Sequence, residues 1–280
     1  MAKPTAPLSR KFALLLIVFA SATGCRHEPA EEAYRHTWSL YAAGNLSQAA
    51  SDCTRNASLF TDRRSPWYWK FRLFEAEILI AQGKMVAAEA LLKDAVPLRF
   101  ESGQLEVRRL VDQAILRADR KDEAKALLER ARHAVTDPEL TIRIRIAEGR
   151  IAWIGRQFQA AHLAYGEAAK MAARQSMPYL QAQALASETA ATKNLGLYEE
   201  TLEIGHHALN LAEQIGAHRL AAVAHSNLGP VYSYLGEAET VADRFRLGFP
   251  ARRRPQRSGG AMGCERYGNR TADGPLLRRN

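Results

Sequence analysis

Several residue patterns that usually mark an enzyme or a metal protein are missing from this chain. Only three of its 280 residues are cysteines, which excludes a disulfide framework and the paired CxxC spacing of structural zinc sites. The HExxH, P-loop and G-x-S-x-G motifs are all absent. His206 and His207 are adjacent, and His218 and His225 stand too far apart on a helix to share one metal ion. We therefore expect no catalytic residue, no metal and no cofactor, and we predict that the protein is not an enzyme.

The charge of the chain is concentrated at its two ends. The formal net charge is +9 and the isoelectric point is near 9.6. Residues 1–24 hold three basic residues and no acidic one, and residues 250–280 hold eight arginines against two acidic residues. Removing both ends from 39 basic and 30 acidic residues leaves 28 of each. The long middle segment is neutral, so we expect no nucleic-acid partner.

Alternation of polar and apolar residues, which marks β-strands, is also nearly absent, and helical repeats take its place. Six times a turn residue, usually glycine, is followed five residues later by a small or β-branched residue, at spacings of 39, 36, 36, 41 and 40 residues. The pairs are Gly44/Ala49, Gly83/Ala88, Asp119/Ala124, Gly155/Ala160, Gly196/Thr201 and Gly236/Val241. This pattern predicts an all-α fold, a right-handed α-solenoid of about six helix–turn–helix units with the last one incomplete.

Apolar stripes of helical spacing support the repeats. Leu140, Ile144, Ala147, Ile151 and Ile154 step by four, three, four and three residues. The residue that lies twelve positions after each turn is small at Ala95, Ala131 and Ala208 but not at Asn56 or Glu167. Trp67, Phe71, Phe74 and Ile78 form another stripe, which we expect in the core. Eleven or twelve helices without a sheet are expected between residues 31 and 245.

Stretches in the last two units and one stretch in the second unit resemble the tetratricopeptide repeat family. The segment 227–237 resembles a first helix and turn, with the pair Leu228-Gly229, then Tyr232 and Gly236 in place. Residues 195–198 with 208–216, and residues 82–95, resemble turns and second helices. The resemblance covers about residues 30–245 and is weakest in the first four units. The first helices of units one, three, four and five lack the Leu-Gly pair.

The resemblance implies a concave wall, built from the first helices, that binds an extended peptide or a partner helix without chemistry. Polar or aromatic positions on these helices are the candidate partner-binding residues: Trp69, Arg108, Arg145, Glu148, Gln181 and Asn227. The identity of the protein or peptide partner is left open.

The N-terminus has the order of a bacterial lipoprotein signal. Lys3, Arg10 and Lys11 precede the nine-residue apolar run 12–20, which is too short to span a bilayer. Ala22-Thr23-Gly24-Cys25 then resembles a lipobox, although Ala22 stands where leucine is usual. We expect residues 1–24 to be a signal peptide, Cys25 to be lipidated, and residues 25–30 to link the anchor to a solenoid of residues 31–247. The expected location is the cell envelope, anchored to a membrane and facing the periplasm; cleavage after Ala20-Ser21-Ala22 and secretion into the periplasm is the alternative.

Residues 248–280 lose helical periodicity and become rich in Arg, Gly and Pro. We expect a disordered tail; a basic binding arm and a shifted reading frame remain alternatives. The sixth unit would then lack a complete second helix and leave Leu235, Val241 and Phe245 exposed, which favours self-association.

These features predict a non-catalytic protein–protein interaction scaffold of the bacterial cell envelope. The alternative is the N-terminal repeat region of a larger protein, since the chain also resembles the start of proteins in which a caspase-like CHAT protease domain follows such repeats.

Overall fold

The computed structural model describes residues 29–60 and 62–235, and these contain eleven α-helices, one short 3₁₀-helix and no strand. The chain divides into two units, residues 1–249 and 250–280, and all described residues belong to the first. The prediction of an all-α fold is confirmed for the described residues. The predicted signal peptide, Cys25, the turn at Gly236 and the C-terminal tail lie outside them.

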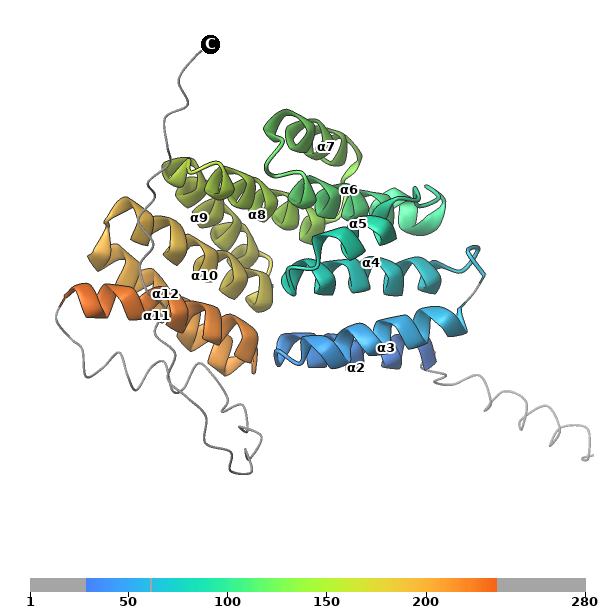
Figure 1. Ribbon diagram of the computed structural model, residues 1–280, viewed down its shortest axis with the longest axis horizontal. Helices are drawn as coiled ribbons and strands as arrows, with labels where there is room; N and C mark the ends of the chain where they lie inside the picture. Colours follow the sequence, from blue (N-terminus) through green and yellow to red (C-terminus); the bar gives the residue numbers. More distant parts are fainter. Residues whose placement is uncertain (1–28, 61, 236–280) are drawn as a thin grey trace, which may run out of the picture. The chain divides into compact units, whose positions relative to one another are not determined.

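The helices follow one another as antiparallel pairs in which neighbours pack together (Figure 1). The first helices of the pairs are α2 (Pro29–Ala42), α4 (Pro66–Ala81), α6 (Gln104–Leu116), α8 (Pro138–Ile154), α10 (Pro178–Leu195) and α12 (His218–Tyr234). The second helices are α3 (Leu46–Leu59), α5 (Met85–Leu92), α7 (Lys121–Ala134), α9 (Phe158–Arg174) and α11 (Tyr198–Gln214). The 3₁₀-helix η1 (Phe100–Gly103) precedes α6.

Proline and short polar side chains start several of these helices. Pro66 and Pro138 occupy the first turn, where a missing N–H leaves no hydrogen bond unmade. The Ser65 hydroxyl accepts a hydrogen bond from the Trp67 N–H at 3.3 Å, and the Asp137 carboxylate accepts one from the Glu139 N–H at 2.7 Å. These caps satisfy N–H groups that the first turn leaves without helical partners.

Four of the five described turns within the helix pairs lie where the repeats predict them. Gly44, Gly83 and Gly196 adopt positive φ angles of 88°, 77° and 75°. The residues five positions later, Ala49, Ala88 and Thr201, are completely buried. The turn at Asp119 joins α6 to α7 without a positive φ, and Ala124 is likewise buried.

The fourth turn is displaced by one residue from the predicted pair Gly155/Ala160. Gly155 has φ −73°, and Arg156 takes the left-handed conformation with φ 57°. Counting from Arg156 puts Ala161 at the plus-five position and Ala168 at plus twelve, and both are completely buried, whereas Ala160 is exposed. The predicted register at this turn was wrong, because the prediction assumed that the glycine takes the left-handed conformation.

Helix α5 is shorter than the repeat predicts. It ends at Leu92, so Ala95 follows the helix, is exposed and takes no part in the expected crossing. The Leu92 carbonyl accepts hydrogen bonds from Arg109 Nη1 and Gln113 Nε2, both at 2.9 Å. Side chains of α6 therefore satisfy a carbonyl that another helical turn would have used.

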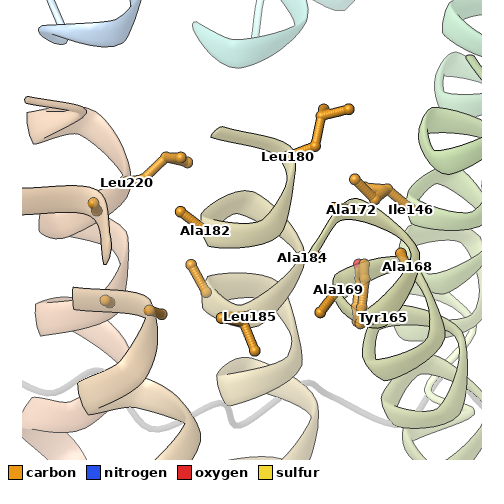
Figure 2. Packing of buried hydrophobic residues seen from close by; sticks show 14 of the residues in the cluster. Ile146, Tyr165, Ala168, Ala169, Ala172, Leu180, Ala182, Ala184, Leu185 and Leu220 are labelled. Atoms are coloured by element: carbon orange, nitrogen blue, oxygen red, sulfur yellow. The ribbon is translucent and has the colours of Figure 1, made fainter. Parts of the chain in front are cut away.

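Alanine dominates the largest buried cluster, which joins α8, α9, α10, α11 and α12 (Figure 2). The close-up shows Ala168, Ala169 and Ala172 of α9 on one side of α10, and Ala182 of α10 on its other side, toward Leu220 of α12. Small side chains at these helix crossings let the backbones approach closely.

Helices from opposite ends of the described chain also touch. The Trp38 and Tyr179 rings, on α2 and α10, lie edge to face with centroids 5.0 Å apart. The Arg219 guanidinium of α12 lies 4.6 Å from the centroid of the Tyr41 ring on α2. A linear array in which each unit contacts only its neighbours does not provide these contacts.

Candidate functional site

A polar cavity of about 240 Å³ lies where the first helices of the pairs converge. Its charged wall consists of four arginines and two carboxylates, and apolar side chains of α4, α6 and α8 complete it. The charged residues are Glu77, Arg108, Asp112, Arg143, Arg150 and Arg219. Tyr41 of α2 and Gln183 of α10 also line the cavity, so each of the six first helices contributes a side chain.

One ion-pair network holds three first helices together at the cavity. Glu77 on α4 binds Arg108 of α6 at 2.6 Å and Arg143 of α8 at 3.3 Å, one with each carboxylate oxygen. Arg108 also donates a hydrogen bond to the Tyr34 hydroxyl of α2 at 2.8 Å. Removing Glu77 would leave two partly buried arginines with fewer acceptors, which is costly in such surroundings.

The network sets the protonation of Glu77. Burial by itself raises the pKa of this carboxyl, but the positive charges of Arg143 and Arg108 outweigh burial and hold the pKa at about 2. Glu77 is therefore ionised at every physiological pH.

Asp112 has the opposite environment. Its side chain is 6% exposed, and its Oδ2 atom has no hydrogen-bond partner. Burial, together with the negative charge of Glu77, raises its pKa to about 7 against the opposing effect of Arg108, Arg143 and Arg150. A buried carboxylate next to an already ionised one is thus close to its midpoint at neutral pH.

Two of the cavity arginines form no ion pair with a described carboxylate. Arg219 donates a hydrogen bond to the Tyr179 hydroxyl at 2.8 Å and stacks on Tyr41, and within residues 29–60 and 62–235 it forms no ion pair. Arg150 likewise has no ion pair there. Burial raises the pKa of both Tyr41 and Tyr179, so these phenols stay neutral and do not compensate the charge. The cavity consequently carries more positive than negative charge.

An apolar hollow of about 400 Å³ lies next to this cavity and shares Arg143 with it. Trp38, Met177, Tyr179, Leu180 and Ile215 provide most of its lining. Trp38 is 38% exposed, so an indole ring of the first helix remains open to solvent beside Tyr179.

The structure places only one of the candidate partner-binding residues, Arg108, at the cavity. Trp69 is 3% exposed, packs with Leu73 and Leu92, and donates its indole N–H to the Arg63 carbonyl at 3.0 Å. Its position is explained by core packing.

The other candidates lie elsewhere. Arg145 pairs with Glu148 at 2.6 Å and with Glu167 of α9 at 2.5 Å, and Glu148 also pairs with Arg132 of α7. Asn227 donates from Nδ2 to the Ala186 carbonyl at 3.0 Å and so ties α12 to α10. Gln181 is partly buried on α10 and does not line the cavity.

Sequence reasoning missed five of the charged residues at the cavity: Glu77, Asp112, Arg143, Arg150 and Arg219. Glu77 stands between Ala76 and Ile78, and Arg143 stands between Ile142 and Ile144, all four of them buried. A charged residue with an apolar residue on each side was the available signal. Such a residue is rarely buried unless it has a partner.

The described residues hold no group of three or more His, Cys, Asp or Glu side chains arranged to bind a metal ion. None of their helices is both long and apolar enough to cross a membrane. Cys53 is a free, buried cysteine, and burial raises the pKa of its thiol. No protein-family model matches the chain, and no curated protein matches it either.

Proposed function

We propose that this protein is a non-catalytic scaffold that binds a segment of another protein along its first helices. The helix pairs, joined by turns 36–40 residues apart once Arg156 replaces Gly155, support an α-solenoid related to tetratricopeptide repeats. In this proposal Cys25 carries a lipid that holds the scaffold in the cell envelope, and no nucleic acid is bound.

The observation that carries the proposal is the open hollow around Trp38. Tryptophan and tyrosine are the residues most often found at the centres of protein interfaces, where they bury a large apolar area and retain a polar group. Here both stand on first helices beside a hollow of about 400 Å³. We propose that it receives an apolar side chain of an extended peptide, because the repeat region has no excess charge with which to attract a charged one.

A peptide library displayed on phage and panned against the purified protein tests this directly. Enriched peptides should share an aromatic or branched aliphatic residue, and Trp38→Ala should weaken their binding about tenfold or more. Trp153→Ala is the matched control, because Trp153 is 40% exposed on α8 and does not line the hollow. Equal affinity of the enriched peptides for Trp38→Ala and for the native protein would contradict binding at the hollow around Trp38.

The lipid anchor is tested separately. Expressed in a bacterium, the native chain should fractionate with membranes, and Cys25→Ala should move to the soluble envelope fraction. Two or more acyl chains give stable anchoring, so the difference should survive repeated washing. Cys53→Ala controls for general effects of cysteine loss. A Cys25→Ala protein that still needs detergent for release would contradict lipidation.

A further inference from the structure

We propose that the central cavity binds a small oxyanion, either free phosphate or the carboxylate of a small organic acid. This inference is separate from the binding of a peptide at Trp38, since it concerns a different set of residues.

The balance of charge around the cavity is the first argument. Glu77 pairs with both Arg108 and Arg143, and Arg143 also pairs with Glu139 at 2.8 Å. Arg150 and Arg219 form no ion pair with any described residue. A partly buried guanidinium without an anionic partner is unfavourable, and an entering anion would supply that partner.

Unused hydrogen-bonding groups are the second argument. The Nε atoms of Arg108 and Arg219 are buried and have no hydrogen-bond acceptor. Arginine presents its donors in a planar fork that matches two oxygens of a carboxylate or a phosphate. The cavity therefore combines surplus positive charge with donors of the geometry that oxyanions need.

The size of the cavity restricts the ligand. A volume of about 240 Å³ corresponds to about eight water molecules at liquid density. Phosphate or a short carboxylic acid fits such a space together with some water, whereas a folded peptide segment does not. The neutral Tyr41 ring at one wall also suits a short aliphatic or aromatic body.

Because the cavity arginines stand on different helices, a bound anion would stabilise the folded state. Arg108, Arg150 and Arg219 belong to α6, α8 and α12, so one bound anion would bridge helices far apart in the chain. A ligand that binds only the folded state raises the melting temperature by mass action.

Calorimetric titration and thermal unfolding of the full chain, with sodium phosphate and sodium acetate as separate probes, test the proposal. At a hundredfold excess over Kd, a saturating anion should raise Tm by about 5–10 °C. Sodium chloride at equal ionic strength should not. Binding of phosphate alone identifies the free tetrahedral ion, and binding of acetate identifies the carboxylate group.

Three variants locate the site. Arg150→Gln and Arg219→Gln should each bind the anion about ten- to a hundredfold more weakly, because each loses a charge-assisted hydrogen bond. Arg145→Gln is the control on the same helix as Arg150, since its partners are Glu148 and Glu167 outside the cavity. Asp112→Asn removes a negative charge from the wall and should bind the anion several-fold more tightly, even if the arginine variants fail to fold.

Three results would overturn the proposal. The first is the absence of saturable binding by both probes. The second is unchanged affinity in folded Arg150→Gln and Arg219→Gln. The third is binding to Asp112→Asn that is no tighter than to the native protein.

Discussion

At the scale of single residues, Asp112 shows how burial on a first helix changes the pKa of a carboxyl group. Its carboxyl group is buried beside Glu77, and its pKa of about 7 lies well above the value of about 4 for an aspartate in an unfolded chain. The folded state therefore holds the proton more strongly than the unfolded state does. The free energy of unfolding therefore falls as the pH rises from about 4 to about 7. Above that range Asp112 causes no further decrease.

Asp112→Asn should remove this part of the pH dependence. Urea unfolding at pH 5 and pH 8 should show a native protein that loses stability at the higher pH. Between these two pH values, the free energy of unfolding of the variant should decrease by on the order of 2 kcal/mol less than that of the native protein. Glu188, whose pKa burial and Glu200 raise to about 7, accounts for a remaining decline of the same sign. The ionised Glu77 contributes only below this window, since its pKa is about 2. Identical losses in both proteins would contradict the environment assigned to Asp112.

Arg156 is the second residue whose conformation has a measurable consequence. It holds φ 57°, a region that costs a residue with a Cβ about 1 kcal/mol or more relative to glycine. Arg156→Gly should therefore raise the free energy of unfolding by about 0.5–1 kcal/mol.

Gly196→Ala provides the reverse comparison, because φ is 75° there and alanine should destabilise the turn by a similar amount. Gly155→Ala serves as the neutral control, with φ −73° and only ordinary van der Waals distances around an added Cβ. A loss of stability in Arg156→Gly would show that the side chain makes a contact that outweighs the strain.

At the scale of elements, the close crossing of second and first helices limits side-chain size. A Cβ added to Gly205 on α11 would lie 2.5 Å from Leu228 Cδ2 on α12 and 3.0 Å from Thr189 Cγ2 on α10. Gly205 thus allows one helix to contact two others at once. Leu228 and Thr189 are completely buried, so a shift of either side chain would disturb the packed residues around it.

Gly205→Ala should lower the free energy of unfolding by about 1–3 kcal/mol through overpacking, in spite of the better helix propensity of alanine. Chemical denaturation measures the loss. In a Leu228→Ala background the same substitution should cost much less, because the clashing side chain is gone. An equal loss in both backgrounds would place the strain elsewhere.

At the scale of the whole molecule, contacts between α2 and the helices α10 and α12 distinguish this chain from a simple linear array. The Trp38–Tyr179 and Arg219–Tyr41 contacts join the first helix pair to the fifth pair and to α12. Removing either partner of such a contact should therefore lower the stability of helices that are distant in sequence, which a nearest-neighbour array would not couple.

A double-mutant cycle with Trp38→Ala and Tyr179→Leu measures this coupling. Edge-to-face aromatic pairs contribute about 0.5–1.5 kcal/mol, so the two losses should fall short of additivity by about that amount. Trp153→Ala combined with Tyr179→Leu is the control, and it should be additive. Additive losses for Trp38 and Tyr179 would mean that the two ends of the array unfold independently.

Local sequence was sufficient to predict the helices and most turns. Glycine marks a turn through its tolerance of positive φ, as at Gly44 and Gly196, and apolar stripes mark buried faces at helical spacing. Both signals are short-range, so they are visible in a single chain. The same signals failed at Arg156, where a residue with a Cβ takes the glycine conformation, and at α5, which ends before Ala95.

Only packing between distant helices determines the cavity. Arg108 meets Tyr34 across 74 residues, and Arg143 meets Glu77 across 66. The local signal at Arg143, an apolar residue on each side, is shared by Arg145, which lies outside the cavity. Local pattern therefore does not show which of the 28 basic residues in the middle segment face inward. Arg143 and Arg145 are two positions apart on α8, yet only Arg143 pairs with Glu77 at the cavity, while Arg145 pairs with Glu148. The same packing keeps the Glu77 carboxyl ionised and raises the pKa of Asp112 to about 7.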